Sequence, residues 1–434
     1  MHFLDKIFKL KDNGTNTKTE AIAGLTTFLT MVYIVFVNPA ILGDAGMDKS
    51  AVFVTTCIIA GLGTIALGLF ANMPIAMAPA LGLSPFFAYV VVNKLGYSWQ
   101  VGMGAVFIGC VAFLLLSIFQ VRYWIISNIP VGLRVGIGAG IGLFIALIGF
   151  HNMGLVVASP ATMVTLGDLH DFRILLGLLG FLVIIVLAYF RIYQGVLISI
   201  VAVTILALIF DSNIKFSGIV SLPPSISSVV GHVDILGALT NFELFGIIFA
   251  FMLVTLFDSS GTIISVLKKA GLVRKDGSFP NMKKALLVDS SATVVGAYLG
   301  TSALSTYIES GSGVSVGGKT GLTAVVVGIL FLIALFFSPL LSIVPTYATA
   351  GALVYVGILM GGSLREVNWD DITEATPAFL TAVMMPFTYS ITEGIAFGFI
   401  SYVILKALTG RFKEINLAVL IVAILFIVKF AWIG

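Results

Sequence analysis

The chain has 434 residues, of which 59% are hydrophobic, 12% are aromatic and only 10% are charged, and its formal net charge is +3. A soluble globular chain carries about a quarter charged residues, so this composition indicates a membrane protein. It excludes a disordered chain, a nucleic-acid-binding protein and a disulfide scaffold. Because so small a net charge identifies no partner, the positions of the charges carry the information.

Apolar segments near the length of about 20 residues that a membrane-spanning helix needs recur along the chain. Residues 1–20 are polar and charged, and we predict that they lie in the cytoplasm. We predict fourteen spans, at residues 21–43, 51–71, 74–92, 99–120, 124–149, 173–190, 193–210, 244–267, 285–300, 303–317, 320–337, 345–361, 377–391 and 394–409. The C-terminal hydrophobic segment 410–434 contains a further apolar stretch, 415–433, which is either another span or an interfacial helix.

The basic residues favour one orientation of these spans. With the N-terminus in the cytoplasm, most of the 23 Lys and Arg residues lie on the cytoplasmic side, and the loop 268–284 is especially rich in them. Cytoplasmic loops of membrane proteins carry such an excess. We therefore predict a multi-pass protein of the cytoplasmic (inner) membrane, surrounded by lipid, with a cytoplasmic N-terminus.

The order of the spans predicts an internal repeat. Seven spans precede the extracytoplasmic linker 212–243 and seven follow it, so the second half enters the membrane from the opposite side. The third span of each half is a poor helix, because prolines interrupt residues 72–89 and glycines interrupt residues 300–322. Interrupted segments at corresponding positions are the best sequence indication of a transport site near the midplane. Two packing kinks are the alternative.

Two carboxylates stand out within these spans, Asp258 in the eighth and Glu309 where the tenth is interrupted. Ionisable residues inside a membrane are costly and are usually functional. We predict that both bind substrate and that one of them carries a coupling proton. The alternatives are that Asp258 binds backbone freed near Ser259, Ser260 and Gly261, and that Glu309 pairs with Lys319.

Other residues receive different predictions. Asp289 begins the ninth span beside a basic loop, so we expect it at the membrane interface, and Arg134 is assigned a structural role. Phe86 and Phe87 follow the interruption of the third span. Core packing is the default for any phenylalanine in so aromatic a chain, but their position favours stacking on a planar ligand.

Six stretches carry a resemblance to a known family. They are TEAIAGLTTFLTMVYIVFVNPAIL, SAVFVTTC, NMPIAMAPALGLSPFFAY, LFDSSGTI, YIESGSGVSVGGKTGLTAVVVG and TPAFLTAVMMPFTYSITEGIAFGFISY. Together they resemble the AzgA-like purine permeases, a branch of the nucleobase-cation symporter family. LFDSSGT and SVVGHVD are most similar to the bacterial adenine permeases within that branch. The likeness extends from about Thr17 to the C-terminus.

This resemblance implies an all-α fold of about fourteen transmembrane helices in two inverted seven-helix repeats, with helices 3 and 10 broken. It implies a core domain at 21–120 and 244–337 and a gate domain at 121–211 and 338–409. It also implies import of purine nucleobases, most readily adenine, together with protons, and it assigns the family's acidic site residues to Asp258 and Glu309. The family motif GLNAFF reads GLSPFF here, so Ser84 replaces an asparagine that lines the site.

Several alternatives stay open at this point. One is a guanine/hypoxanthine permease of the same branch, and another is an anion transporter of the same fold, which would need cationic residues at the site. Sodium is an alternative to the proton, and a homodimer is an open alternative to a monomer. The spans contain no metalloprotease, serine-hydrolase or aspartate-rich metal motif, so we expect neither an enzyme nor a cofactor or metal site.

Overall fold

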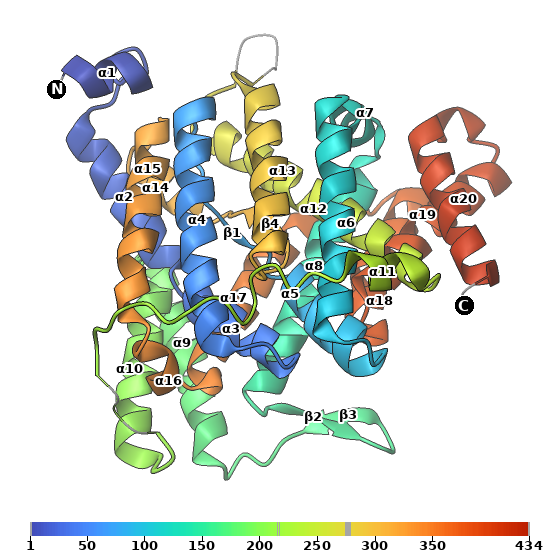
Figure 1. The fold of residues 1–434 in the computed structure, drawn as a ribbon. Helices are drawn as coiled ribbons and strands as arrows, with labels where there is room; N and C mark the ends of the chain where they lie inside the picture. Colours follow the sequence, from blue (N-terminus) through green and yellow to red (C-terminus); the bar gives the residue numbers. More distant parts are fainter. Residues whose placement is uncertain (1, 215, 217, 274–278, 433–434) are drawn as a thin grey trace.

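The computed structural model describes residues 2–214, 216, 218–273 and 279–432 (Figure 1). The centre of the basic loop 268–284 and the last two residues of segment 410–434 therefore lie outside the described residues. The first half of the chain contains the helices α1 (His2–Phe8), α2 (Thr17–Met31), α3 (Ile34–Asp44), α4 (Lys49–Ala71), α5 (Leu83–Pro85), η1 (Phe86–Lys94), α6 (Trp99–Ile118), α7 (Val121–Asn128), α8 (Val131–Asn152), α9 (Phe172–Tyr189) and α10 (Gly195–Phe210), with strands β1 (Met77–Pro79), β2 (Val156–Ser159) and β3 (Met163–Leu166).

The second half begins after the linker and its short helix α11 (Ile235–Thr240). It contains α12 (Leu244–Lys269), α13 (Met282–Tyr298), β4 (Leu304–Thr306), α14 (Ser310–Ser315), α15 (Gly321–Ala334), η2 (Leu335–Phe337), α16 (Leu340–Ile343), α17 (Thr346–Gly361), η3 (Gly362–Glu366), α18 (Ile372–Thr388), α19 (Ile391–Leu408), η4 (Phe412–Glu414) and α20 (Leu417–Trp432).

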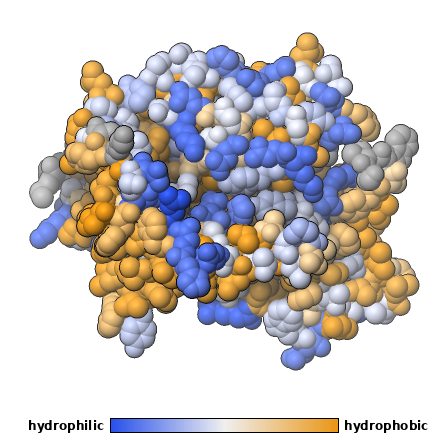
Figure 2. All heavy atoms as spheres, turned by 90° about the horizontal axis from the view of Figure 1, so that it is seen from below, coloured by the Kyte–Doolittle hydropathy of each residue, from blue (hydrophilic) through white to orange (hydrophobic). Residues whose placement is uncertain are grey.

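Each of the fourteen predicted spans contains a helix, and the spans 74–92 and 303–317 also contain a strand. Among the described residues, eight helices are long and apolar enough to cross a bilayer; the total of fourteen crossings stays a prediction. The predicted span 124–149 contains two helices, because Pro130, which has no backbone N–H to continue a helix, stands directly before α8 and after α7. Viewed end-on in Figure 2, hydrophilic residues cross the centre of the face and hydrophobic residues gather at its flanks.

The two interrupted segments meet at the centre of the fold. Strands β1 and β4 pair antiparallel, with Met77 opposite Thr306 and Pro79 opposite Leu304. Each strand is followed by a short helical segment, α5 with η1 in the first half and α14 in the second. The pairing satisfies backbone groups that an unbroken helix would have bonded internally, which a membrane interior requires. The two interruptions predicted at corresponding positions of the halves therefore lie against each other.

The C-terminal helix α20 packs along α19. Lys429 near its end forms an ion pair of 2.7 Å with Glu393 in the first turn of α19, and Glu414, just before α20, pairs with Lys406 in the last turn of α19. The two helices therefore run antiparallel. Phe426 also packs on Phe249 of α12, with ring centroids 5.6 Å apart. This packing favours a helix aligned with the bundle over one lying flat in the interface.

Candidate functional site

The two predicted carboxylates line the same cavity. Asp258 lies in the middle of α12, and Glu309 stands at the start of α14, directly after β4. Both side chains border a small cavity of about 60 Å³, together with Leu81 and Gly82 of the interrupted third segment. Helices α8 and α17 close the opposite side of this cavity, where Ile141 and Met360 lie. Two acids far apart in sequence are thus brought to the crossing of the interrupted helices.

A larger cavity adjoins the small one. It has a volume of about 380 Å³ and shares Ile308, Glu309 and Val356 with its neighbour. Pockets that hold small ligands usually measure about 300–1,000 Å³. Arg191 and Lys269, at the ends of α9 and α12, also line it. The larger cavity therefore extends from Glu309 towards the end of the bundle that carries the lysines of α12.

Glu309 is held by a residue that the sequence analysis missed. The Tyr33 hydroxyl donates a hydrogen bond of 2.7 Å to Oε1 of Glu309. Tyr33 lies between α2 and α3, where the first span bends. Thr26 and Thr30 bond back to carbonyls one turn earlier, which bends helices. These threonines could have indicated a bend in the first span, but they do not indicate that Tyr33 is the side chain that reaches Glu309.

The predicted alternatives for the two acids are wrong. Helix α12 runs unbroken from Leu244 to Lys269, so Asp258 has no freed backbone to bind there. No ion pair among the described residues joins Glu309 to Lys319. The backbone N–H of Lys319 instead donates to the buried carboxylate of Glu20, which caps the start of α15. Neither acid makes the contact that its alternative required.

The expectation that Asp289 lies at the interface is also wrong. Asp289 is completely buried in α13 and forms an ion pair of 2.9 Å with Arg122 of α7, which is equally buried. The expectation failed because α13 begins at Met282, seven residues before Asp289. Asp289 therefore lies two helical turns away from the basic loop.

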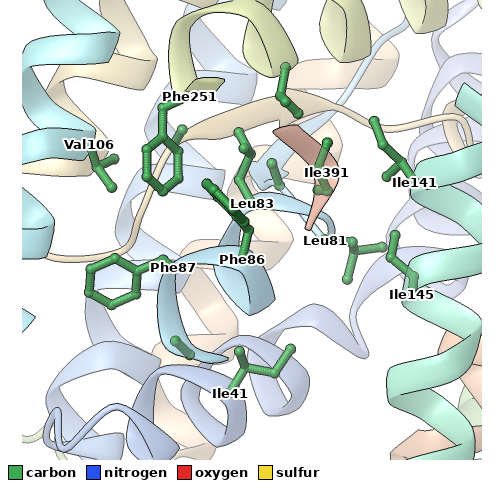
Figure 3. Packing of buried hydrophobic residues seen from close by; sticks show 14 of the residues in the cluster. Ile41, Leu81, Leu83, Phe86, Phe87, Val106, Ile141, Ile145, Phe251 and Ile391 are labelled. Atoms are coloured by element: carbon green, nitrogen blue, oxygen red, sulfur yellow. The ribbon is translucent and has the colours of Figure 1, made fainter. Parts of the chain in front are cut away.

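The residues predicted from the third span lie behind the site. Ser84 is buried and donates a hydrogen bond of 2.8 Å to the side-chain oxygen of Asn38. Phe86 packs on Phe251 with ring centroids 5.2 Å apart. Figure 3 places Phe86 and Phe87 inside a cluster of buried hydrophobic side chains. None of the three lines either cavity in this conformation, so the structure brings Asp258 and Glu309 together without them.

The described residues include no group of three or more His, Cys, Asp and Glu side chains arranged to hold a metal ion. Arg134, which was assigned a structural role, lies in α8, and among the described residues its buried Nε has no hydrogen-bond partner.

Comparison with known proteins decides the family. The model of the xanthine/uracil permeases, described as the Permease family, matches residues 18–397. The chain belongs to this permease family. It is 61% identical over 426 residues to the adenine permease AdeQ of Escherichia coli, covering 98% of this chain and 96% of that one. It is 60% identical to the adenine permease AdeP of the same organism, covering 99% and 96%. It is 45% identical to the guanine/hypoxanthine permease PbuO of Bacillus subtilis, covering 98% and 99%.

Solved structures share the fold at low sequence identity. The transmembrane domain of the cyanobacterial bicarbonate transporter BicA matches with a TM-score of 0.63 and 15% identity, covering 87% of this chain and 97% of that one. SLC26A9 matches with a TM-score of 0.66 and 10% identity, covering 91% and 65%. The predicted inverted-repeat fold is thereby confirmed.

Proposed function

We propose that this permease imports purine nucleobases, with adenine as its preferred substrate, by proton symport across the cytoplasmic membrane. The observation that carries the proposal is the pair of acids, Asp258 and Glu309, lining one cavity where two interrupted helices cross. The printed names of the two E. coli relatives support adenine.

The chemistry of the base fits two carboxylates. Adenine presents N–H donors at its amino group and on its imidazole ring, whereas an ionised carboxylate only accepts hydrogen bonds. Glu309 is the carboxylate that Tyr33 already orients, and we assign it to the donor edge of the base. Guanine and hypoxanthine carry an oxygen in place of the adenine amino group. An oxygen facing a carboxylate leaves two acceptors without a proton between them, and such mismatches discriminate strongly between ligands.

Proton coupling needs a carboxylate that changes charge during the cycle. Protonating Asp258 or Glu309 would remove one of two negative charges beside a single cavity, and an uncompensated charge at membrane depth is costly. Proton binding therefore lowers the cost of moving the substrate-loaded site during the transport cycle. The structural relatives include a bicarbonate transporter, but two acids at the site favour a neutral base with a proton over an anion.

Alternating access follows from the position of the large cavity. We assign residues 21–120 and 244–337 to a core and residues 121–211 and 338–409 to a gate. The cavity is lined from the proposed core by α2, α12 and α14 and from the proposed gate by α9, α10 and α17. Arg191 and Lys269 line its far end from Asp258, on the side that the positive-inside rule assigns to the cytoplasm. We therefore assign this conformation to the inward-facing state, from which the base leaves.

The test is uptake of radiolabelled adenine into cells that lack their own purine carriers, measured with the outside either acidic or alkaline. We expect uptake to require outside acid and to be competed by adenine more strongly than by guanine, hypoxanthine, uracil or sulfate. Strong competition by guanine and hypoxanthine would assign the protein to oxopurines. Absence of purine uptake by well-expressed protein would refute the proposal.

Glu309→Gln tests the assigned site, because it keeps the shape of the side chain and removes its charge. A hydrogen bond to a charged group contributes about 1.5–3 kcal/mol, so we expect adenine binding to weaken about ten- to 150-fold. The matched control is Glu243→Gln, at an exposed glutamate that bonds Tyr97 outside both cavities. Equal binding by Glu309→Gln and the control would contradict the assignment.

A further inference from the structure

A buried ion pair lies behind the transport site on the helix that connects the proposed core to the proposed gate. Arg122 of α7 and Asp289 of α13 are 2.9 Å apart, and both side chains have no exposed surface. Helix α7 is the first helix of the proposed gate segment 121–211, and it directly follows α6, the last helix of the first core segment. Removing two charges from water is costly even when they pair, so a buried pair at this connection calls for an explanation beyond packing.

Arg122 fixes the connector to three helices of the proposed core. Its Nε donates a hydrogen bond of 3.0 Å to Ser260 of α12, and its Nη1 donates one of 3.4 Å to the carbonyl of Leu286 in α13. Its guanidinium lies 4.4 Å from the ring centroid of Phe113 in α6. The far end of α7 is held differently, since the carbonyl of Asn128 accepts a hydrogen bond from Asn416, just before α20.

Serine hydroxyls join this ion pair to the acid of the site. Ser259 donates a hydrogen bond of 3.0 Å to Oδ1 of Asp289. The same hydroxyl lies 3.4 Å from that of Ser305, and Ser305 lines the small cavity beside Asp258. Polar groups therefore lead from the small cavity, which Asp258 and Ser305 both line, through Ser259 to Asp289 and Arg122.

Two atoms of this network make no hydrogen bond among the described residues, Nη2 of Arg122 and Oδ2 of Asp289, although the latter lies 2.9 Å from Nη1 of Arg122 in the ion pair. The Nη2 nitrogen of Arg122 is buried and makes no hydrogen bond within the described part of the chain. Buried polar groups are almost always bonded, and an unpaired donor on a charged group is costly. A hydrogen-bond network that changes partners during a transport cycle requires a donor that is unpaired in one of its conformations.

We propose that Arg122 and Asp289 are positioning residues for proton coupling, linking the charge on Asp258 to the connector helix α7 through Ser259. The inference rests on the proposed function of the site. When Asp258 is ionised, its charge acts on Asp289, the partner of Arg122. When a proton binds Asp258, this repulsion is removed, and the strength with which Asp289 holds Arg122 and helix α7 changes.

The other groups that face Asp258 enter the same balance. Glu309 and Tyr307, from the segment after β4, border the small cavity with it. The Tyr307 hydroxyl donates to the carbonyl of Pro79, so it stays bound to β1 and does not bond the acid. Glu309 is bound by Tyr33. The Arg122–Asp289 ion pair therefore links the surroundings of Asp258 to helix α7.

Ser259→Ala is the sharpest test, because it cuts the path without leaving a buried charge. Adenine counterflow, which needs no net proton movement, and proton-driven accumulation are measured in the same vesicles over a range of outside pH. We expect counterflow within about threefold of wild type, while the pH of half-maximal accumulation shifts by at least about half a unit. The matched control is Ser199→Ala, which removes a buried hydroxyl of α10 that donates only to the backbone carbonyl of Gly180 and should leave the profile unchanged.

A second variant keeps the inference testable if cutting the path unfolds the protein. Arg122→Met combined with Asp289→Asn removes both charges together, whereas either change alone leaves one charge buried and unpaired. We expect the double variant to retain counterflow and to show the shifted pH profile. A wild-type pH profile in Ser259→Ala or in the double variant, with intact wild-type transport, would overturn this inference alone. Absence of proton-driven adenine uptake by the wild type would overturn the proposed function and this inference with it.

Discussion

The hydrogen bond from Tyr33 to Glu309 makes the strongest quantitative prediction. Tyr33→Phe keeps the buried ring, which is 1% exposed, and removes only the hydroxyl that lies 2.7 Å from Oε1 of Glu309. A hydrogen bond to a charged group contributes about 1.5–3 kcal/mol. Glu309 borders two cavities, so water can replace part of the lost bond. We therefore expect the loss of binding free energy to lie at the lower end of that range, which raises the Kd for adenine about tenfold.

The assay is adenine binding to purified protein by isothermal titration calorimetry, with unfolding temperature as the measure of fold integrity. Tyr347→Phe is the control, because it removes another buried hydroxyl that donates to a carboxylate, that of Asp211, and Tyr347 lines neither cavity. We expect that control to bind adenine as the wild type does. If Tyr33→Phe binds adenine with wild-type affinity while Glu309→Gln does not, Tyr33 does not orient the carboxylate and the reasoning is refuted.

Two further predictions concern stability. Hydrogen bonds from Arg411 hold the pKa of Asp371 well below its usual range. The folded pKa thus lies below the unfolded value of about 3.9, so this stabilisation is present above about pH 4 and is lost as the pH falls further. We expect the drop in Tm between pH 6 and pH 3 to be smaller in Arg411→Gln than in wild type, and equal drops would contradict this. Gly321→Ala places a methyl group against the carbonyl of Gly68, where α15 meets α4, so we expect the free energy of unfolding to fall by about 1–3 kcal/mol. The control is Gly138→Ala, where the methyl group meets open space, and we expect no fall in its Tm. An equal fall in both variants would refute the packing argument.

Local composition was sufficient for much of this protein. The apolar segments predicted the positions of the helices, because length and hydrophobicity decide which segments reside in a bilayer. Prolines and glycines predicted where the third and tenth segments are interrupted, since they remove donors or weaken helices wherever they stand. Asp258 and Glu309 were identifiable because a carboxylate inside an apolar span is costly in any fold.

Only the tertiary structure decided which side chains meet. Tyr33 and Glu309 are 276 positions apart, and nothing in either local sequence specifies their contact. The sequence placed Asp289 at the membrane interface, whereas in the structure it lies within α13 and pairs with the buried Arg122. Phe86 and Phe87 follow an interruption, yet they face the hydrophobic core. The physical reason is the same in each case: hydrophobicity and backbone propensity act within a segment, whereas the direction of a side chain depends on the segments that pack against it.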